Sequence, residues 1–332
     1  MAEQTSFVFN NLKLVIGGAV LFFCLSGLLY WSAPTDGHYE VDSQAYERVV
    51  NIFLETGTMQ DVGNTPPIHT QGYHFFLAII YWLFGSSIGV LVGVQVILSF
   101  IAILLIVQTA FLLFGTTCAQ IVYGIAVVDG AFLIYPQFVL AETLLIFLLA
   151  LFFYKMACFY KTRKISDVAL AGLILGISLI VKPTALFLPI FFALCFGFFS
   201  LFYTTTFTWV QLGIFAAATY IPVCLYIIRN GLTFGAYKFS FLMDFNLYLW
   251  FPALLLSKIQ QVPLQDCLDS MQRLADSSYS TLQSEYWEPL RSFFLQLVMT
   301  RPLLVIGIWM QNILKTFFGL YSVQLWPYER IG

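Results

Sequence analysis

The sequence predicts an all-α, polytopic membrane protein, and the observations that predict it are its composition and the spacing of its charges. Of the 332 residues, 60% are apolar and only 10% are charged, and the mean hydropathy is +0.86. The charges cluster before residue 65, around residues 155–164 and between residues 229 and 301. A transmembrane helix needs about 20 apolar residues, and the tracts between these clusters supply them. A soluble globular domain is therefore excluded.

The apolar tracts predict about eight transmembrane helices. The expected spans are residues 12–31, 88–114, 117–135, 138–160, 167–181, 184–203, 208–229 and 301–321. The first tract is longer than the apolar core of a signal peptide and is expected to stay as an anchor. The tract from 168 to 202 is interrupted only by Lys182, which precedes a proline, and we interpret it as two spans joined by a tight turn.

Basic residues predict the orientation of these spans. The densest basic run outside the large loops consists of Lys155, Lys161, Arg163 and Lys164. The positive-inside rule places this run in the cytoplasm. Counting spans from it places residues 33–87, Glu142, Lys182 and residues 230–300 together on the opposite face. The expected membrane is a bacterial inner membrane or the endoplasmic reticulum, with a site on the periplasmic or lumenal side.

The two long loops are expected to contain folded segments. Residues 42–57 have the pattern of an amphipathic helix that lies on the membrane surface, with Asp42 as a candidate N-cap and Gly57 at its end. Residues 72–84 are apolar but short, and they lie along the interface or extend the second span. Residues 264–275 have helical spacing of apolar residues. Glu40 and Asp61 are expected to be solvated loop residues.

A series of short motifs, found in order along the chain, resembles one family of membrane enzymes. The motifs are Asp42-Ser-Gln-Ala-Tyr46, Gly57, Gly72-Tyr73, Phe76-Leu77-Ala78, Leu83-Phe84-Gly85, Ala141-Glu142-Thr143-Leu144, Ala171-Gly172-Leu173, Lys182-Pro183-Thr184, Arg229-Asn230, Phe234-Gly235, Asn246-Leu247-Tyr248 and Arg301-Pro302. Together they resemble the GT-C superfamily glycosyltransferases that use dolichyl- or undecaprenyl-phosphate sugars, which include the protein O-mannosyltransferases and the lipid A aminoarabinose transferases. The resemblance covers about residues 10–325.

The chain also departs from the family pattern. Ala45 stands where the family often has an arginine before the tyrosine, and the family's basic residue followed by two prolines is rearranged here as Pro66-Pro67-Ile68-His69. Family members are usually longer. The resemblance implies one membrane-embedded domain over residues 1–332, without the family's usual C-terminal region.

The resemblance implies transfer of one sugar from a polyprenyl-phosphate carrier to a protein, glycan or lipid acceptor, with inversion at the anomeric carbon. An attacking hydroxyl loses its proton, so a carboxylate is needed as general base. The resemblance assigns this role to Asp42, directly or through a bound divalent metal, Mg or Mn. From the residues alone, a role of Asp42 as a helix cap is as well supported as a catalytic role. No nucleic-acid partner is expected at a net charge of −2.

The leaving phosphate needs positive charge around it. The candidate cations on the outer face are His69, Lys182 and Arg229, and Tyr46 and Tyr73 are candidate contacts to sugar or phosphate. The expected supporting residues are Glu142, Asn230 and Asn246. Each has an ordinary alternative: Arg229 snorkels to the headgroups, Lys182 and Glu142 form a structural pair across the bundle, and the tyrosines are interfacial.

Two other functions share these features. A transporter or flippase of lipid-linked sugars would have the same spans and embedded charges without a base in the first outer loop, although many transporters have internal repeats and this sequence has none that we recognise. A catalytically silent subunit that binds a glycolipid is the second alternative.

Overall fold

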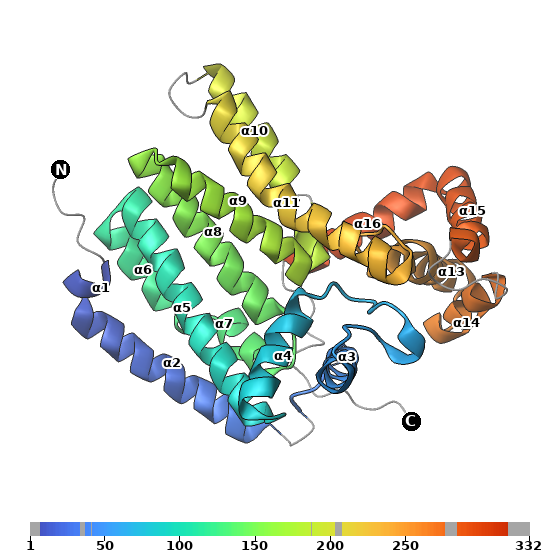
Figure 1. Cartoon of the computed structure of the whole chain (residues 1–332), viewed down its shortest axis with the longest axis horizontal. Helices are drawn as coiled ribbons and strands as arrows, with labels where there is room; N and C mark the ends of the chain where they lie inside the picture. Colours follow the sequence, from blue (N-terminus) through green and yellow to red (C-terminus); the bar gives the residue numbers. More distant parts are fainter. Residues whose placement is uncertain are drawn as a thin grey trace. The chain divides into compact units, whose positions relative to one another are not determined.

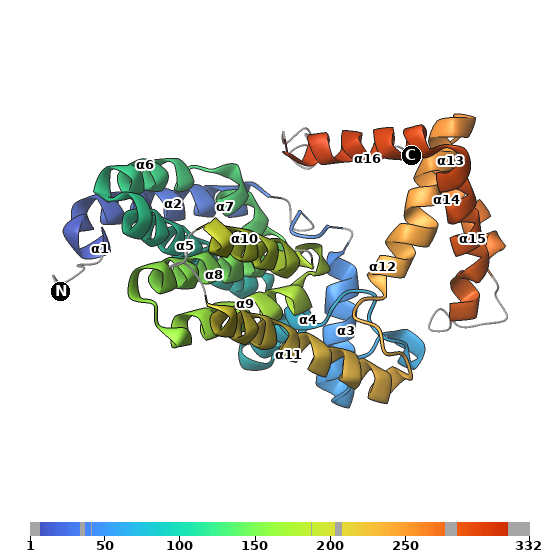
Figure 2. The same cartoon turned by 90° about the horizontal axis from the view of Figure 1, so that it is seen from above.

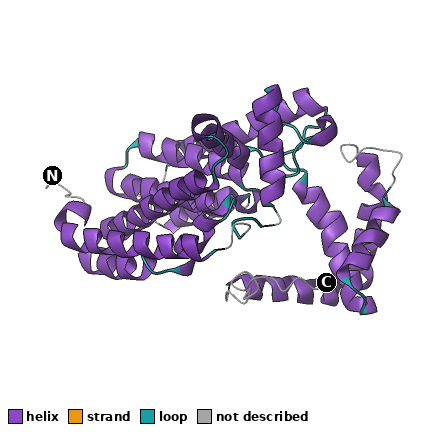
Figure 3. Cartoon of the chain, turned by 90° about the horizontal axis from the view of Figure 1, so that it is seen from below, coloured by secondary structure: helices purple, strands orange, loops and turns teal. Residues whose placement is uncertain are grey.

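The computed structural model describes residues 7–33, 37–40, 42–186, 188–202, 208–275 and 284–317. These residues form helices and loops, and none of them forms an extended strand (Figure 3). An all-helical chain suits a bilayer because each backbone N–H and C=O is then bonded within its own segment. The chain divides into two compact units, Met1–Ser240 and Phe241–Gly332.

The first unit contains most of the apolar helices. Its elements are α1 (Phe7–Asn10), α2 (Leu12–Ser32), α3 (Ser43–Thr56), η1 (Val62–Asn64), α4 (Gly72–Phe84), α5 (Ile88–Phe114), α6 (Thr116–Ala126), α7 (Gly130–Ile134), η2 (Tyr135–Gln137), α8 (Glu142–Thr162), α9 (Ile165–Val181), η3 (Pro183–Ala185), α10 (Leu188–Phe202) and α11 (Trp209–Phe234). Figure 1 labels the α-helices and colours them along the chain from blue at the N-terminus to red at the C-terminus.

Four described helices are long and apolar enough to cross a membrane, or up to six if each of two bent helix pairs counts as one span. The four are α2, α5, α8 and α11. One bent pair replaces the straight span expected at 117–135, because α6 ends at Ala126 and the next helices turn by 53°. Asp129 causes this break in part, since its carboxylate accepts a hydrogen bond from the Ala131 N–H at 2.9 Å and starts α7. The last span was expected to run past residue 317, outside the described residues.

Five helices of the first unit pack in succession, α2 against α5, α5 against α8, α8 against α9 and α9 against α11 (Figures 1 and 2). Glycines of α9 allow a close approach to the backbone of α11. A Cβ added to Gly172 would lie 2.6 Å from the Phe215 carbonyl oxygen, and one added to Gly176 would lie 2.3 Å from that of Thr219. Small residues let apolar helices pack backbone to backbone. This contact fixes α9, whose last turn leads to the candidate site.

Helices α8 and α9 form an antiparallel hairpin, and the charged residues on them lie toward its two opposite ends. At the turn between them, Arg163 ends α8 in the left-handed conformation. Lys155 and Asp167 pair across the hairpin at 3.4 Å. Glu142 begins α8 and Lys182 follows α9, so both lie at the other end of the hairpin.

The second unit contains α12 (Leu242–Asp244), η4 (Phe245–Trp250, a π-helix), α13 (Phe251–Gln260), α14 (Leu264–Leu274), α15 (Ser284–Thr300) and α16 (Pro302–Phe317). Its core includes residues of η4, α13, α14 and α15: Leu249, Ala253, Leu268, Met271 and Leu290. The apolar spacing seen at 264–275 is thus the buried face of α14.

Candidate functional site

The segment before α3 is bonded to the chain just before α8. The Ser43 hydroxyl donates to the Val139 carbonyl at 3.0 Å and accepts from the Glu40 N–H at 2.9 Å. The Val139 N–H donates to the His38 carbonyl at 3.1 Å. Ser43 is fully buried. These bonds hold the start of α3 beside the start of α8, about 100 residues away in the chain.

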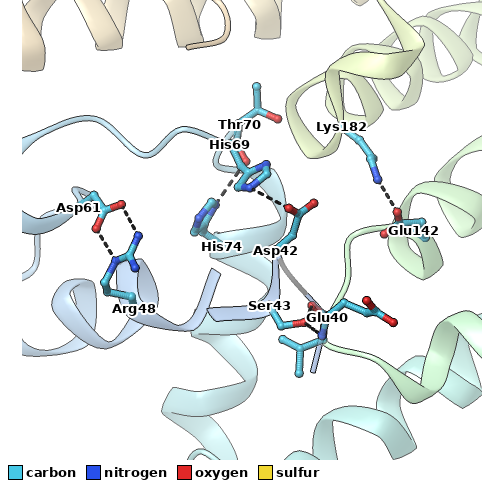
Figure 4. A network of polar contacts seen from close by, with 11 residues as sticks. Glu40, Asp42, Ser43, Arg48, Asp61, His69, Thr70, His74, Glu142 and Lys182 are labelled. Atoms are coloured by element: carbon cyan, nitrogen blue, oxygen red, sulfur yellow. Dashed lines mark hydrogen bonds and ion pairs between the residues drawn. The ribbon is translucent and has the colours of Figure 1, made fainter. Parts of the chain in front are cut away.

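Asp42 occupies the position before α3, but its side chain makes no cap hydrogen bond, so the expected capping role is wrong. The carboxylate instead lies 3.7 Å from His69 Nε2 and is 44% exposed. Figure 4 shows it between the His69 ring and the pair formed by Lys182 and Glu142. A half-exposed carboxylate that does not serve its own helix is available to a ligand.

The position of His69 is set by a ring contact and by a backbone contact of the next residue. Its side chain is 10% exposed, and its ring lies 4.8 Å from that of Tyr46. The next residue, Thr70, donates to the Val181 carbonyl at 3.4 Å. Burial lowers the pKa of His69, an effect that Asp42 opposes. The imidazole is therefore neutral at pH 7 and can donate one hydrogen bond, but it supplies no fixed positive charge.

Lys182 and Glu142 form the ion pair that the sequence suggested, and the side chain of each is 24% exposed (Figure 4). One oxygen of Glu142, Oε2, is buried and has no hydrogen-bond partner in the described part of the chain. Glu40 lies close to this group: burial raises its pKa, and the Asp42 and Glu142 carboxylates raise it further. Three carboxylates, one ammonium and one imidazole therefore meet at one end of the first unit.

Gly72 sets the distance between the segment that carries His69 and the end of α9. A Cβ at this position would lie 2.6 Å from the Val181 backbone nitrogen. Only a glycine allows α4 to begin this close to the residue that precedes Lys182. His69 and Lys182, 113 positions apart, are thus positioned by the same backbone contact.

The two candidate tyrosines are more buried than a substrate contact requires. Tyr46 is 2% exposed and Tyr73 is fully buried, with their rings 4.8 Å apart. The Tyr73 hydroxyl donates to Gln95 at 3.1 Å, and the Gln95 amide donates to the Phe138 carbonyl at 2.7 Å. Burial raises the pKa of Tyr46, and Asp42 adds to the effect, so its phenol stays protonated. Both rings are therefore part of the packed core beside the site.

Arg229 and Asn230 are engaged in holding the chain. Arg229 donates to the Met59 carbonyl at 3.2 Å and to Asn230 Oδ1 at 3.1 Å, and its guanidinium lies 5.0 Å from the centre of the Phe234 ring. Asn230 is fully buried and donates to the Lys238 carbonyl at 3.0 Å. These contacts tie the end of α11 to the segment that follows α3.

The structure also places two further residues of the sequence analysis, Asn246 and Asp61. Asn246 lies on η4, in the second unit, where it is exposed. Asp61 is not a solvated loop residue: it accepts two hydrogen bonds from Arg48, at 2.7 and 2.9 Å. Neither the Arg48–Asp61 pair nor the place of Glu40 at the site could be found from the sequence, because these residues do not lie at a motif spacing.

The described residues contain no group of three or more His, Cys, Asp and Glu side chains placed to hold a metal ion. Of the carboxylates at the site, Asp42 lies beside His69 and Glu142 is paired with Lys182. Comparisons of the chain with protein-family models, curated proteins and solved structures find no match.

Proposed function

We propose that the chain is a membrane glycosyltransferase of the GT-C type, which transfers one sugar from a polyprenyl-phosphate carrier to an acceptor with inversion. The supporting observation is the meeting of Asp42, His69, Lys182 and Glu142 from four separate segments at one end of the first unit. The proposal includes eight spans, interfacial helices at residues 42–57 and 72–84, and a site on the periplasmic or lumenal side.

Asp42 is the proposed general base. Its carboxylate is exposed enough to meet an acceptor hydroxyl. The Nε2 atom of His69 lies 3.7 Å from this carboxylate, which is longer than a hydrogen bond but keeps the ring beside the proposed base. A correctly placed general base raises the rate of such a step by about 10²- to 10⁴-fold.

Lys182 is the proposed partner of the leaving phosphate. Negative charge grows on that phosphate as the sugar departs, and an ammonium beside it lowers the barrier. Lys182 is paired with Glu142, and in this proposal the ammonium contacts the donor phosphate in place of, or together with, that carboxylate.

The test is sugar transfer by the purified protein in lipid, offered a panel of polyprenyl-phosphate monosaccharides with and without Mg or Mn. Wild-type protein should release polyprenyl phosphate, and Asp42→Asn should reduce the rate at least 100-fold. Its folding should stay close to wild type, because the Asp42 side chain makes no cap hydrogen bond. Glu55→Gln is the matched control, since it removes an exposed carboxylate from the same helix.

Two outcomes would contradict the proposal. Donor binding without turnover in wild type and variant alike would indicate a transporter or a silent subunit, and lipid-flipping assays would separate those two. A loss of folded protein in Asp42→Asn equal to its loss of rate would return Asp42 to a structural role.

A further inference from the structure

The turn between α8 and α9 carries a dense positive charge at the end of the first unit opposite Asp42. Lys161, Arg163 and Lys164 lie within four consecutive positions, and all three are exposed. The nearest acidic residue along the chain is Asp167. It pairs with Lys155 at 3.4 Å and accepts from the Thr162 hydroxyl at 3.1 Å. The three basic side chains of the turn together carry a formal charge of +3.

Apolar and aromatic groups lie within the same turn. Tyr160 is 56% exposed and Ile165 is 51% exposed. The Arg163 guanidinium lies 5.5 Å from the centre of the Tyr160 ring, and the Lys161 ammonium lies 5.8 Å from it. An exposed aromatic ring beside cations is typical of the headgroup region of a membrane.

The position of the turn decides between possible anionic partners. It follows directly on α8, a 21-residue helix that is apolar enough to cross a bilayer. A side chain at the end of such a helix lies at the depth of the lipid headgroups rather than out in solution. A nucleic acid or an acidic protein would have to approach through that layer, whereas a phospholipid is already there.

We propose that Lys161, Arg163 and Lys164 form a binding site for the phosphate headgroup of an anionic phospholipid. The headgroup phosphate accepts hydrogen bonds from the cations, and the apolar side chains of Tyr160 and Ile165 contact the adjoining part of the lipid. This site is independent of the proposed transferase reaction and lies at the opposite end of the α8–α9 hairpin from Lys182.

The test uses the full chain in phosphatidylcholine vesicles that contain spin-labelled phosphatidylglycerol or, in parallel, spin-labelled phosphatidylcholine. Electron spin resonance measures the lipid that is immobilised at the protein. Wild-type protein should select phosphatidylglycerol, and the triple variant K161Q/R163N/K164Q should lower this selectivity about tenfold or more, since each basic residue near the surface contributes to it. Asparagine is chosen at 163 because it tolerates the left-handed backbone there.

The matched control removes three exposed basic charges elsewhere, in the variant K258Q/R273Q/R291Q. It should keep the wild-type selectivity. A second measurement needs no variant: raising NaCl from about 0.05 to 0.5 M should reduce the selectivity of wild-type protein, because salt screens exposed charges. Equal immobilisation of both lipids by wild type would overturn the proposal, and so would an equal loss of selectivity in the two triple variants.

Discussion

The Lys182 ammonium pairs with the Glu142 carboxylate and so joins the residue that follows α9 to the first residue of α8. The two residues are 40 positions apart and lie at the same end of an antiparallel hairpin. The pair closes that end of the hairpin, as the Lys155–Asp167 pair closes the other. Between them, the two pairs fix how α8 and α9 align along their length.

Removing one member of the Lys182–Glu142 pair should cost more stability than removing both. Lys182→Met leaves a partly buried carboxylate without a partner and should lower the free energy of unfolding by about 2 kcal/mol, whereas Lys182→Met combined with Glu142→Gln should recover part of it. Thermal unfolding of both single variants and the double variant measures the coupling. If Lys182 also serves the donor phosphate, the double variant should recover stability and still show a raised donor KM. If the double variant recovered both the stability and the wild-type donor KM, the pair would have a structural role only.

Arg229 should be needed for the order of the segment after α3 rather than for donor binding. Arg229→Lys keeps the charge but loses the planar fork that reaches Met59 and Asn230 together. Hydrogen exchange at residues 57–61 should therefore become faster, with the donor KM unchanged. The control is Arg273→Lys, on an exposed face of α14, which should alter neither. A raised KM with unchanged exchange would restore Arg229 as a phosphate ligand.

The contact between α9 and α11 should not tolerate a methyl group. Gly176→Ala places a Cβ 2.3 Å from the Thr219 carbonyl oxygen, so the helices must separate, and the expected loss of stability is about 1–3 kcal/mol. Gly213→Ala, on α11, meets nothing within 4 Å and should be neutral or slightly stabilising, because alanine favours a helix. Thermal unfolding in the same lipid compares the two. Equal effects would show that helix propensity, rather than packing, decides at these positions.

His69 should make stability depend on pH in one direction. Its pKa in the folded protein lies below its ordinary value of 6.5, chiefly because of burial. Between those two pKa values the unfolded chain binds more protons, so the contribution of His69 is fully present above pH 6.5 and is lost as the pH falls toward the folded pKa. Tm measured from pH 7.5 to 5.5 should therefore fall more steeply for wild type than for His69→Gln. If Tm fell equally with pH in wild type and in His69→Gln, the lowered pKa of His69 would be contradicted.

The sequence by itself determined the class of the protein and part of the site. Long apolar tracts can satisfy their backbone in a bilayer only as helices, so composition was enough to predict an all-helical membrane protein. Lys182 and Glu142 could be paired in advance, because an ionisable group between apolar tracts needs a partner and few were available.

Only the tertiary structure decided what the other polar groups contact. Packing brings together segments that are distant in the chain, and three polar contacts join such segments. His69 lies near Asp42, Arg229 donates to the Met59 carbonyl, and Tyr73 donates to Gln95. Gly72, Gly172 and Gly176 lie against the backbone of another segment, and nothing local in the sequence distinguishes them from other glycines. Hydrophobic periodicity specifies which residues are buried, whereas the partner of a buried polar group depends on how the helices meet.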